Sequence, residues 1–289
     1  MSTLSDHLFG LSHFADRFDL FVIDQWGVLH NGRHPYPGAR EALEALKNAG
    51  KTVIILSNSS RPASDNIKGM NAKGFKKGTH FDDIVTSGEA FAHSVRIGKT
   101  ILPGNHVFLF TPPGDDAHLH DLGLIRVATP EMADFLLIGG SLHPTEWKDI
   151  LHLLNVAKNR NLPAICANPD IHGMDGDRLV LVGGAVAKHY EEMGGTVTWF
   201  GKPYPDIYET VFDLASRPAP GRGLAIGDSL LHDIKGGCNA GLVTCLIACG
   251  IHGQAFGDAK TEKALHTALV PLSHEYGVTP DLILPRFVW

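Results

Sequence analysis

Short apolar runs alternate with longer amphipathic stretches in the first part of the chain. An apolar run at 18–23 (FDLFVI) is followed by an amphipathic stretch at 37–50 (PGAREALEALKNAG) and by a second apolar run at 52–57 (TVIILS). Apolar runs of this length are typical of buried strands. Their alternation with helical patterns predicts βαβ units and therefore a parallel sheet.

The same alternation returns near the end, with strand and loop at 221–229, a helix at 230–241 and a strand at 242–248. The middle of the chain has apolar runs and an amphipathic stretch of its own, at 106–110, 134–139, 145–160 and 162–167. We therefore predict one parallel-sheet domain, formed by residues 1–86 and 198–289, and a smaller inserted α/β domain at 87–197.

The composition and net charge of the chain limit the classes of binding partner that we expect. The chain has 289 residues, of which 44% are hydrophobic and 19% charged, with a formal net charge of -6. No basic run accompanies this charge, so nucleic acid and membrane surfaces are not expected partners. No apolar stretch reaches the length of about 18 residues that a spanning helix needs, and we find no targeting signal. The four cysteines form no CxxC pair, which favours reduced thiols in a cytoplasmic protein.

The 17 histidines raise the question of a zinc site. The close pairs, His118/His120 and His30/His34, have no cysteine or glutamate at the spacing of zinc motifs. We do not expect zinc.

Four polar stretches follow predicted strands, at the edge where parallel sheets bind their ligands. They contain Asp24 (IDQWG), Ser57 (SNSSR), Lys202 (FGKPYP) and Asp228 (GDSLLHD). Asp24 is suited to attack an electrophile or to hold a cation, or it caps a turn. The hydroxyls and N–H groups at Ser57 suit an anion at a helix start, or a helix N-cap. Asp228 and Asp233, with Ser229 between them, suit a hard cation such as Mg²⁺, or they cap the following helix.

In this order, the four stretches resemble the motifs of the haloacid dehalogenase superfamily: an Asp nucleophile, a Ser or Thr, a Lys and a metal-binding acidic loop. The stretches TSGEAFAHSV, CANPD and GKPYPDIYE resemble the type IIA members with a large α/β cap, which include p-nitrophenyl phosphate, pyridoxal phosphate and nucleotide phosphatases. This resemblance implies a Rossmann-like, doubly wound parallel-sheet core with 87–197 as an inserted α/β cap domain.

The resemblance also assigns roles. Asp24 would be the nucleophile that forms an aspartyl phosphate, and Ser57 and Lys202 would assist it. Asp24, Asp228 and the main-chain carbonyl of Trp26 would hold Mg²⁺, supported by Asp233 and Ser229. The phosphate and the rest of the substrate would be bound by Gly27, Asn58, Ser59, Arg61, Asn168 and Asp170. We therefore expect a Mg²⁺-dependent hydrolase of small phosphate monoesters.

Trp26 departs from the pattern, which has a second Asp at this position to protonate the leaving group and activate water. General acid–base assistance contributes about 10² to 10⁴ in rate. Three alternatives follow: a phosphatase that favours good leaving groups or uses His30 or His232 in place of the acid, a binding protein with little turnover, and a carbon–halogen hydrolase. The partner is expected to be a small phosphorylated metabolite, and relatives with this cap suggest a homodimer formed through it.

Overall fold

The computed structural model describes residues 10–110, 121–140, 147–175, 178–257, 259 and 261–289. Contacts divide the chain into two compact units. The first consists of Met1–Leu56, Ile67–Ile84 and Val211–Trp289, and the second of Ser57–Asn66 and Val85–Thr210. The second unit thus includes 57–66, 85–86 and 198–210 in addition to the whole stretch expected to form the cap, whose limits at 87 and 197 stay a prediction.

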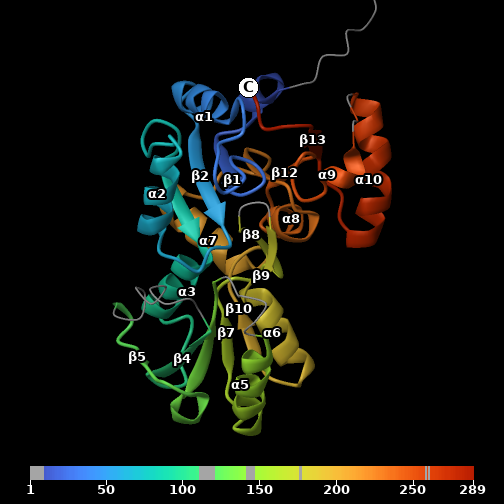
Figure 1. Ribbon diagram of the computed structural model, residues 1–289. Helices are drawn as coiled ribbons and strands as arrows, with labels where there is room; N and C mark the ends of the chain where they lie inside the picture. The colour runs from blue at the N-terminus through green and yellow to red at the C-terminus, as the bar shows by residue number, and fades with distance from the viewer. Residues whose placement is uncertain (1–9, 111–120, 141–146, 176–177, 258, 260) are drawn as a thin grey trace, which may run out of the picture. The chain divides into compact units, whose positions relative to one another are not determined.

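A six-stranded sheet contains strands from the beginning and the end of the chain (Figure 1). Its order is β13 (Leu282–Leu284), β12 (Val243–Ile247), β11 (Gly223–Gly227), β1 (Leu20–Asp24), β2 (Thr52–Ser57) and β3 (Asp83–Thr86). The pairs from β13 to β2 are parallel. Every residue of β1 and β11 is buried, as the continuous apolar runs predicted.

The strand order reverses between β1 and β11. From β1 the chain proceeds outward to β2 and β3, and from β11 it proceeds in the other direction to β12 and β13. Because parallel crossovers are right-handed, the helices of the two directions cover opposite faces of the sheet. This is the doubly wound arrangement, and it confirms the predicted fold class. The carboxyl ends of β1 and β11 form its switch point, where such sheets bind ligands.

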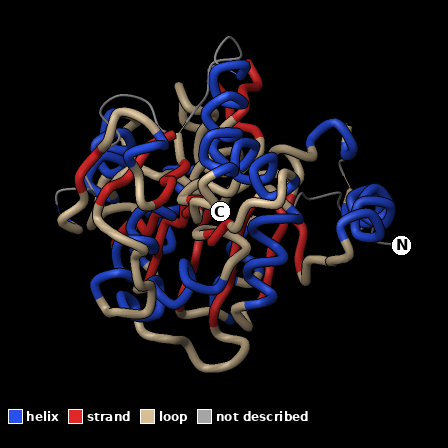
Figure 2. The backbone as a smooth tube through the Cα atoms, turned by 90° about the horizontal axis from the view of Figure 1, so that it is seen from below, coloured by secondary structure: helices blue, strands red, loops and turns tan. Residues whose placement is uncertain are grey.

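The helices can be followed in Figure 2, where they are blue and the strands red. Helix α1 illustrates how the sequence sets their limits: Ala42, Leu43 and Leu46 are buried on one face, and Gly50, with φ of 71°, follows its end. In chain order the helices are α1 (Ala39–Asn48), α2 (Ala63–Ala72), α3 (Ser87–Arg96), α5 (Trp147–Asn159), α6 (Gly183–Glu192), α7 (Pro205–Ala215), α8 (Lys235–Asn239), α9 (Gly253–Phe256) and α10 (Glu262–Tyr276).

The second unit has its own five-stranded parallel sheet, in the order β10 (Val197–Trp199), β7 (Ala164–Cys166), β6 (Phe135–Ile138), β4 (His106–Phe110) and β5 (Ile125–Arg126). Leu154 and Ala157 of α5 and Val186 and Tyr190 of α6 pack with this sheet in one buried cluster. A separate antiparallel pair is formed by β8 (His172–Asp175) and β9 (Arg178–Leu181).

Strand β10 shows where the sequence pattern was insufficient. The sequence placed residues 198 onward with the first domain, but β10 pairs with β7 in the second sheet. Val197 and Trp199 are partly buried, and Thr198 between them is exposed. A three-residue edge strand has too few positions for its pattern to indicate which sheet it joins.

Two general expectations can be compared with the structure. Within the described ranges, each helix is too short or too polar to cross a membrane. All four cysteines are free thiols, as their spacing predicted.

Candidate active site

Three carboxylates meet at the switch point of the first unit. Asp24 ends β1, Asp228 directly follows β11, and Asp233 lies in the π-helical turn Leu230–Ile234. One carboxylate oxygen from each lies within 4.8 Å of the others. The register explains why, since Ile23 pairs with Ile226, so that β1 and β11 end at the same level. Three carboxylates this close repel one another, and a bound cation relieves that repulsion.

Glycines allow the backbone to approach Asp228 closely. A Cβ atom on Gly27 would lie 1.9 Å from Asp228 Oδ2, and one on Gly250 would lie 2.1 Å from the same oxygen. Directly after Gly250, the Ile251 N–H donates to Asp228 Oδ2 at 2.7 Å. The two close backbone segments and the hydrogen bond from Ile251 help to set the orientation of this carboxylate.

Gly250 and Ile251 were not among the predicted site residues. The signal in the sequence was a glycine shortly after the predicted strand at 242–248, the same position relative to β12 that Gly27 has relative to β1. Such a glycine alone does not indicate which side chain it approaches.

Asp233 and Ser229 stabilise the acidic loop. Asp233 Oδ2 accepts a hydrogen bond from the Ser229 N–H at 3.0 Å, and Ser229 Oγ accepts one from the His232 N–H at 3.2 Å. A Cβ atom on Gly227 would lie 2.0 Å from Asp233 Cγ, so the strand must end in glycine for the turn to fold back. The hydroxyl of Ser229 therefore acts as the N-cap that the sequence had suggested as the simpler alternative.

The Gly27 N–H is already used inside its own loop. It donates to the His30 carbonyl at 3.1 Å, and Gly27 has φ of 77°. The geometry thus gives Gly27 a role in close packing against Asp228, which differs from the predicted role of its N–H in phosphate binding.

Trp26 packs against its own loop. Its indole meets the His30 ring edge-on, with 5.1 Å between ring centroids, and a Cβ atom on Gly32 would lie 2.3 Å from Trp26 Cζ3. The side chain is nevertheless 40% exposed. An exposed indole in this place carries no proton that it could give to a leaving group.

His30 is poorly suited to replace the missing acid. Its side chain is fully buried, and burial lowers its pKa to about 4, with the Lys73 charge as a smaller cause. Its Nδ1 accepts a hydrogen bond from the Gly32 N–H at 2.9 Å, so the neutral ring carries its proton on Nε2. His30 Nε2 lies 3.2 Å from Gln25 Nε2, and it can donate to Gln25 only when that amide is turned so that its oxygen faces the ring. At neutral pH this ring is uncharged and cannot act as a general acid.

A second group of predicted residues comes together in the second unit, around Asn58. Its Nδ2 donates to Asp170 Oδ1 at 2.7 Å and to the Lys202 carbonyl at 3.2 Å. Its Oδ1 accepts from the Lys202 N–H at 2.7 Å and from Ser87 Oγ at 3.3 Å. Lys202 itself is 3% exposed. We call these four residues, Asn58, Ser87, Asp170 and Lys202, the Asn58 cluster.

The serines beside Asn58 form a capped turn. Ser57 Oγ accepts a hydrogen bond from the Ser59 N–H at 3.3 Å, and Ser59 Oγ accepts one from the Arg61 N–H at 3.2 Å. The Arg61 side chain is exposed. Asn168 has a similar local bond, because its Oδ1 accepts from the Asp170 N–H at 3.2 Å. These bonds are those of turns and caps, which the sequence had offered as the simpler alternative for both stretches.

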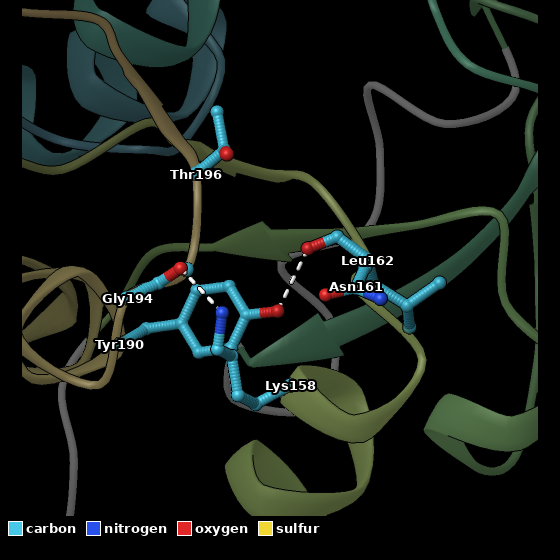
Figure 3. Close-up of a pocket in the computed structure, with 7 residues that line it drawn as sticks. Lys158, Asn161, Leu162, Tyr190, Gly194 and Thr196 are labelled. Atoms are coloured by element: carbon cyan, nitrogen blue, oxygen red, sulfur yellow. Dashed lines mark hydrogen bonds between the residues drawn. The ribbon is translucent and has the colours of Figure 1, made fainter.

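A small hollow in the second unit contains none of the predicted residues (Figure 3). It measures about 40 Å³, which is room for very few water molecules. Tyr190 donates its hydroxyl hydrogen to the Leu162 carbonyl at 2.7 Å, and Lys158 Nζ donates to the Gly194 carbonyl at 2.5 Å. These bonds connect α6 to the loop before β7 and α5 to the loop after α6.

Comparison with known proteins identifies the family. Residues 21–125 match the family described as haloacid dehalogenase-like hydrolase, and residues 199–271 match a second description, HAD-hydrolase-like. The chain belongs to the haloacid dehalogenase-like hydrolases. The two matches include both stretches that carry Asp24 and Asp228, and they confirm the predicted superfamily.

Relatives of this hydrolase match over most of its length. Human chronophin is 29% identical over 251 residues, which is 80% of this chain and 81% of chronophin. The ribonucleotide monophosphatase NagD of Escherichia coli K12 is 25% identical over 233 residues, 80% of this chain and 87% of NagD. The crystal structure of a haloacid dehalogenase-like hydrolase from Brucella suis 1330 has a TM-score of 0.78 at 28% identity, covering 96% of this chain and 99% of that one. The relatives support the type IIA phosphatase group.

Proposed function

We propose that this hydrolase cleaves small phosphate monoesters in a Mg²⁺-dependent reaction in which Asp24 is transiently phosphorylated. The observation that carries the proposal is the meeting of Asp24 with Asp228 and Asp233 at the switch point of the first sheet. Membership in the family and a relative named as a ribonucleotide monophosphatase support it.

The donor set fits Mg²⁺. Three carboxylates whose oxygens lie within 4.8 Å of one another are hard oxygen ligands. The proposal assigns Asp24, Asp228 and the main-chain carbonyl of Trp26 as protein ligands, with Asp233 in support. A main-chain carbonyl does not depend on its side chain, so tryptophan at position 26 is compatible with this role. When bound, the cation would offset the repulsion between the Asp24 carboxylate and a phosphate dianion.

The chemical steps follow from the nature of these groups. The Asp24 carboxylate attacks phosphorus, the bond to the leaving oxygen breaks, and that oxygen departs with the electron pair. We assign to Lys202, Ser57 and the N–H groups of 57–59 the binding of the transferring oxygens. Water then attacks phosphorus in the acyl phosphate, which releases inorganic phosphate and restores the Asp24 carboxylate.

The lack of an acid at position 26 determines which esters react well. An alkoxide needs a proton as it leaves, whereas an aryloxide or a carboxylate departs without one. Because the His30 ring is buried and neutral, it does not supply that proton. We therefore propose a preference for aryl or acyl phosphates over alkyl phosphates.

A second candidate function is a protein of the same fold that binds a phosphate ester and a cation but hardly turns over. The exposed Trp26 indole, in the place where the phosphatase pattern has an acid, favours this alternative. A cytoplasmic location and a homodimer formed through residues 87–197 are further proposals, which rest on the sequence and on the family resemblance.

One comparison separates the two candidates. The purified protein and its Asp24→Asn variant are assayed with Mg²⁺ on p-nitrophenyl phosphate and on a sugar phosphate. We expect the wild type to release p-nitrophenol at a rate that the variant lacks, because asparagine is not a nucleophile towards phosphorus. Equal trace activity of the two proteins on both substrates would favour the binding protein.

A further inference from the structure

The side chain of Asn58 uses all of its hydrogen-bonding capacity inside the second unit. A carboxamide has two N–H donors and an oxygen with two lone pairs. Both donors are engaged, by Asp170 Oδ1 and the Lys202 carbonyl, and both lone pairs are engaged, by the Lys202 N–H and Ser87 Oγ. With the side chain in this arrangement, no donor is left for a phosphate oxygen.

Two of these four bonds hold the backbone of one residue. Asn58 accepts from the Lys202 N–H and donates to the Lys202 carbonyl, so the carboxamide bridges both polar groups of that residue. The neighbouring Gly201 has φ of 113°, and a Cβ atom there would lie 2.2 Å from Ser87 Oγ and 2.8 Å from Asn58 Oδ1. The turn that presents Lys202 is therefore built around the Asn58 side chain.

The bond to Asp170 connects a second predicted functional group. At 2.7 Å it is a short bond from an amide to a carboxylate, of the stronger, charge-assisted kind. To bind phosphate, Asn58 would have to break either this bond or its bond to the Lys202 carbonyl.

We propose that Asn58 is a positioning residue, which fixes the backbone of Lys202 and the carboxylate of Asp170 and does not itself bind the phosphoryl group. This inference rests on the proposed function, since it takes Lys202 as the residue that binds the transferring oxygens. It revises the role that the resemblance had implied for Asn58.

A double-mutant cycle tests this inference. Inorganic phosphate is titrated calorimetrically, in the presence of Mg²⁺, into the wild type, Asn58→Ala, Lys202→Ala and the double variant. If Asn58 acts through Lys202, Asn58→Ala weakens phosphate binding about tenfold in the wild type. In the Lys202→Ala background the same change weakens it by no more than about twofold, because the group that Asn58 positions is already absent.

The opposite result overturns the inference. Equal weakening by Asn58→Ala in both backgrounds would show that Asn58 contacts phosphate directly, and no weakening in the wild-type background would show that it does not position Lys202. If the wild type itself does not bind phosphate or cleave p-nitrophenyl phosphate, the proposed function is overturned together with the inference. If the wild type does both and only the double-mutant cycle disagrees, the inference on Asn58 alone is overturned.

Two controls keep the result interpretable. Asn155→Ala removes an exposed asparagine whose Nδ2 donates to the Leu151 carbonyl one turn before it, and we expect unchanged phosphate binding. Mn²⁺ titration monitors the acidic cluster of the first unit, and Asn58→Ala is expected to leave it unchanged. Should Asn58→Ala not fold, the same cycle is carried out with Asn58→Ser, which also cannot bridge Lys202.

Discussion

The acidic cluster of the first unit and the Asn58 cluster of the second unit differ in the charges that they bring together. In the first, the oxygens of Asp24, Asp228 and Asp233 lie within 4.8 Å of one another. In the second, a neutral carboxamide joins a carboxylate to the backbone of a lysine, and every polar position of Asn58 has a partner. Three neighbouring negative charges favour a bound cation, whereas the Asn58 side chain is satisfied without a ligand. We therefore assign cation binding to the first cluster, and we assign to Asn58 the positioning of Lys202 and Asp170.

The largest expected effect comes from adding an acid to the first cluster. Trp26→Asp would supply the proton donor that an alkyl leaving group requires, so alkyl phosphate hydrolysis should rise by about 10² to 10⁴. Hydrolysis of p-nitrophenyl phosphate should change much less, because its leaving group departs without a proton. Steady-state kinetics on both substrates measure the ratio. Trp26→Asn, which removes the indole without adding an acid, is the matched control, and an equal rise with Asn would contradict this account.

A smaller effect is expected from crowding Asp228. Gly27→Ala would place a Cβ atom 1.9 Å from Asp228 Oδ2, so we expect Mn²⁺ affinity to fall about 100-fold. The matched control is Gly50→Ala, since Gly50 also has a left-handed φ, 71°, but no atom lies within 4 Å of its added Cβ. Both variants carry backbone strain, and only Gly27→Ala displaces the carboxylate. Equal loss of Mn²⁺ affinity in the two variants would show that strain, and not the contact, matters.

An effect of similar size concerns stability, and it tests whether the buried His30 stays neutral. Its pKa is about 4 in the folded protein and about 6.5 when unfolded, so the unfolded chain binds the proton more readily. The free energy of unfolding should therefore decrease as the pH falls from about 6.5 towards 4, by about 3 kcal/mol from this residue.

Urea unfolding at several pH values measures this loss. His30→Gln should remove most of the dependence in that pH range, whereas His34→Gln, at an exposed histidine four residues later, should retain it. A stability that stays constant between pH 6.5 and 4 in the wild type would contradict a buried neutral His30.

The sequence predicted four strands of the first sheet, β1, β2, β11 and β12, because they are apolar runs of five or six residues that alternate with helical patterns or loops. The shorter strands β3 and β13 were not predicted. The runs at 18–23 and 52–57 correspond to β1 and β2, and the alternation around them correctly indicated a doubly wound sheet. The position of Asp24 and Asp228 at strand ends also followed from the pattern, since parallel strands end at one edge.

Other features depended on contacts that no local pattern encodes. The three residues of β10 could not indicate which sheet they join. Asn58 could not reveal that Asp170 and Lys202, more than 100 positions later, would take three of the four hydrogen bonds of its side chain. The use of the Gly27 N–H within its loop and the close approach of Gly250 to Asp228 likewise depend on the folded backbone and not on a local pattern.

The most direct test of the central claim is to trap the phosphorylated enzyme. Wild-type protein is mixed with Mg²⁺ and p-nitrophenyl phosphate and quenched in acid, where acyl phosphates persist, and its peptides are analysed by mass spectrometry. We predict that the peptide containing Asp24 gains the mass of one phosphoryl group, and that Asp24→Asn gains none. Phosphate release by a wild type whose Asp24 peptide stays unmodified, or equal hydrolysis by Asp24→Asn, would contradict Asp24 as the nucleophile.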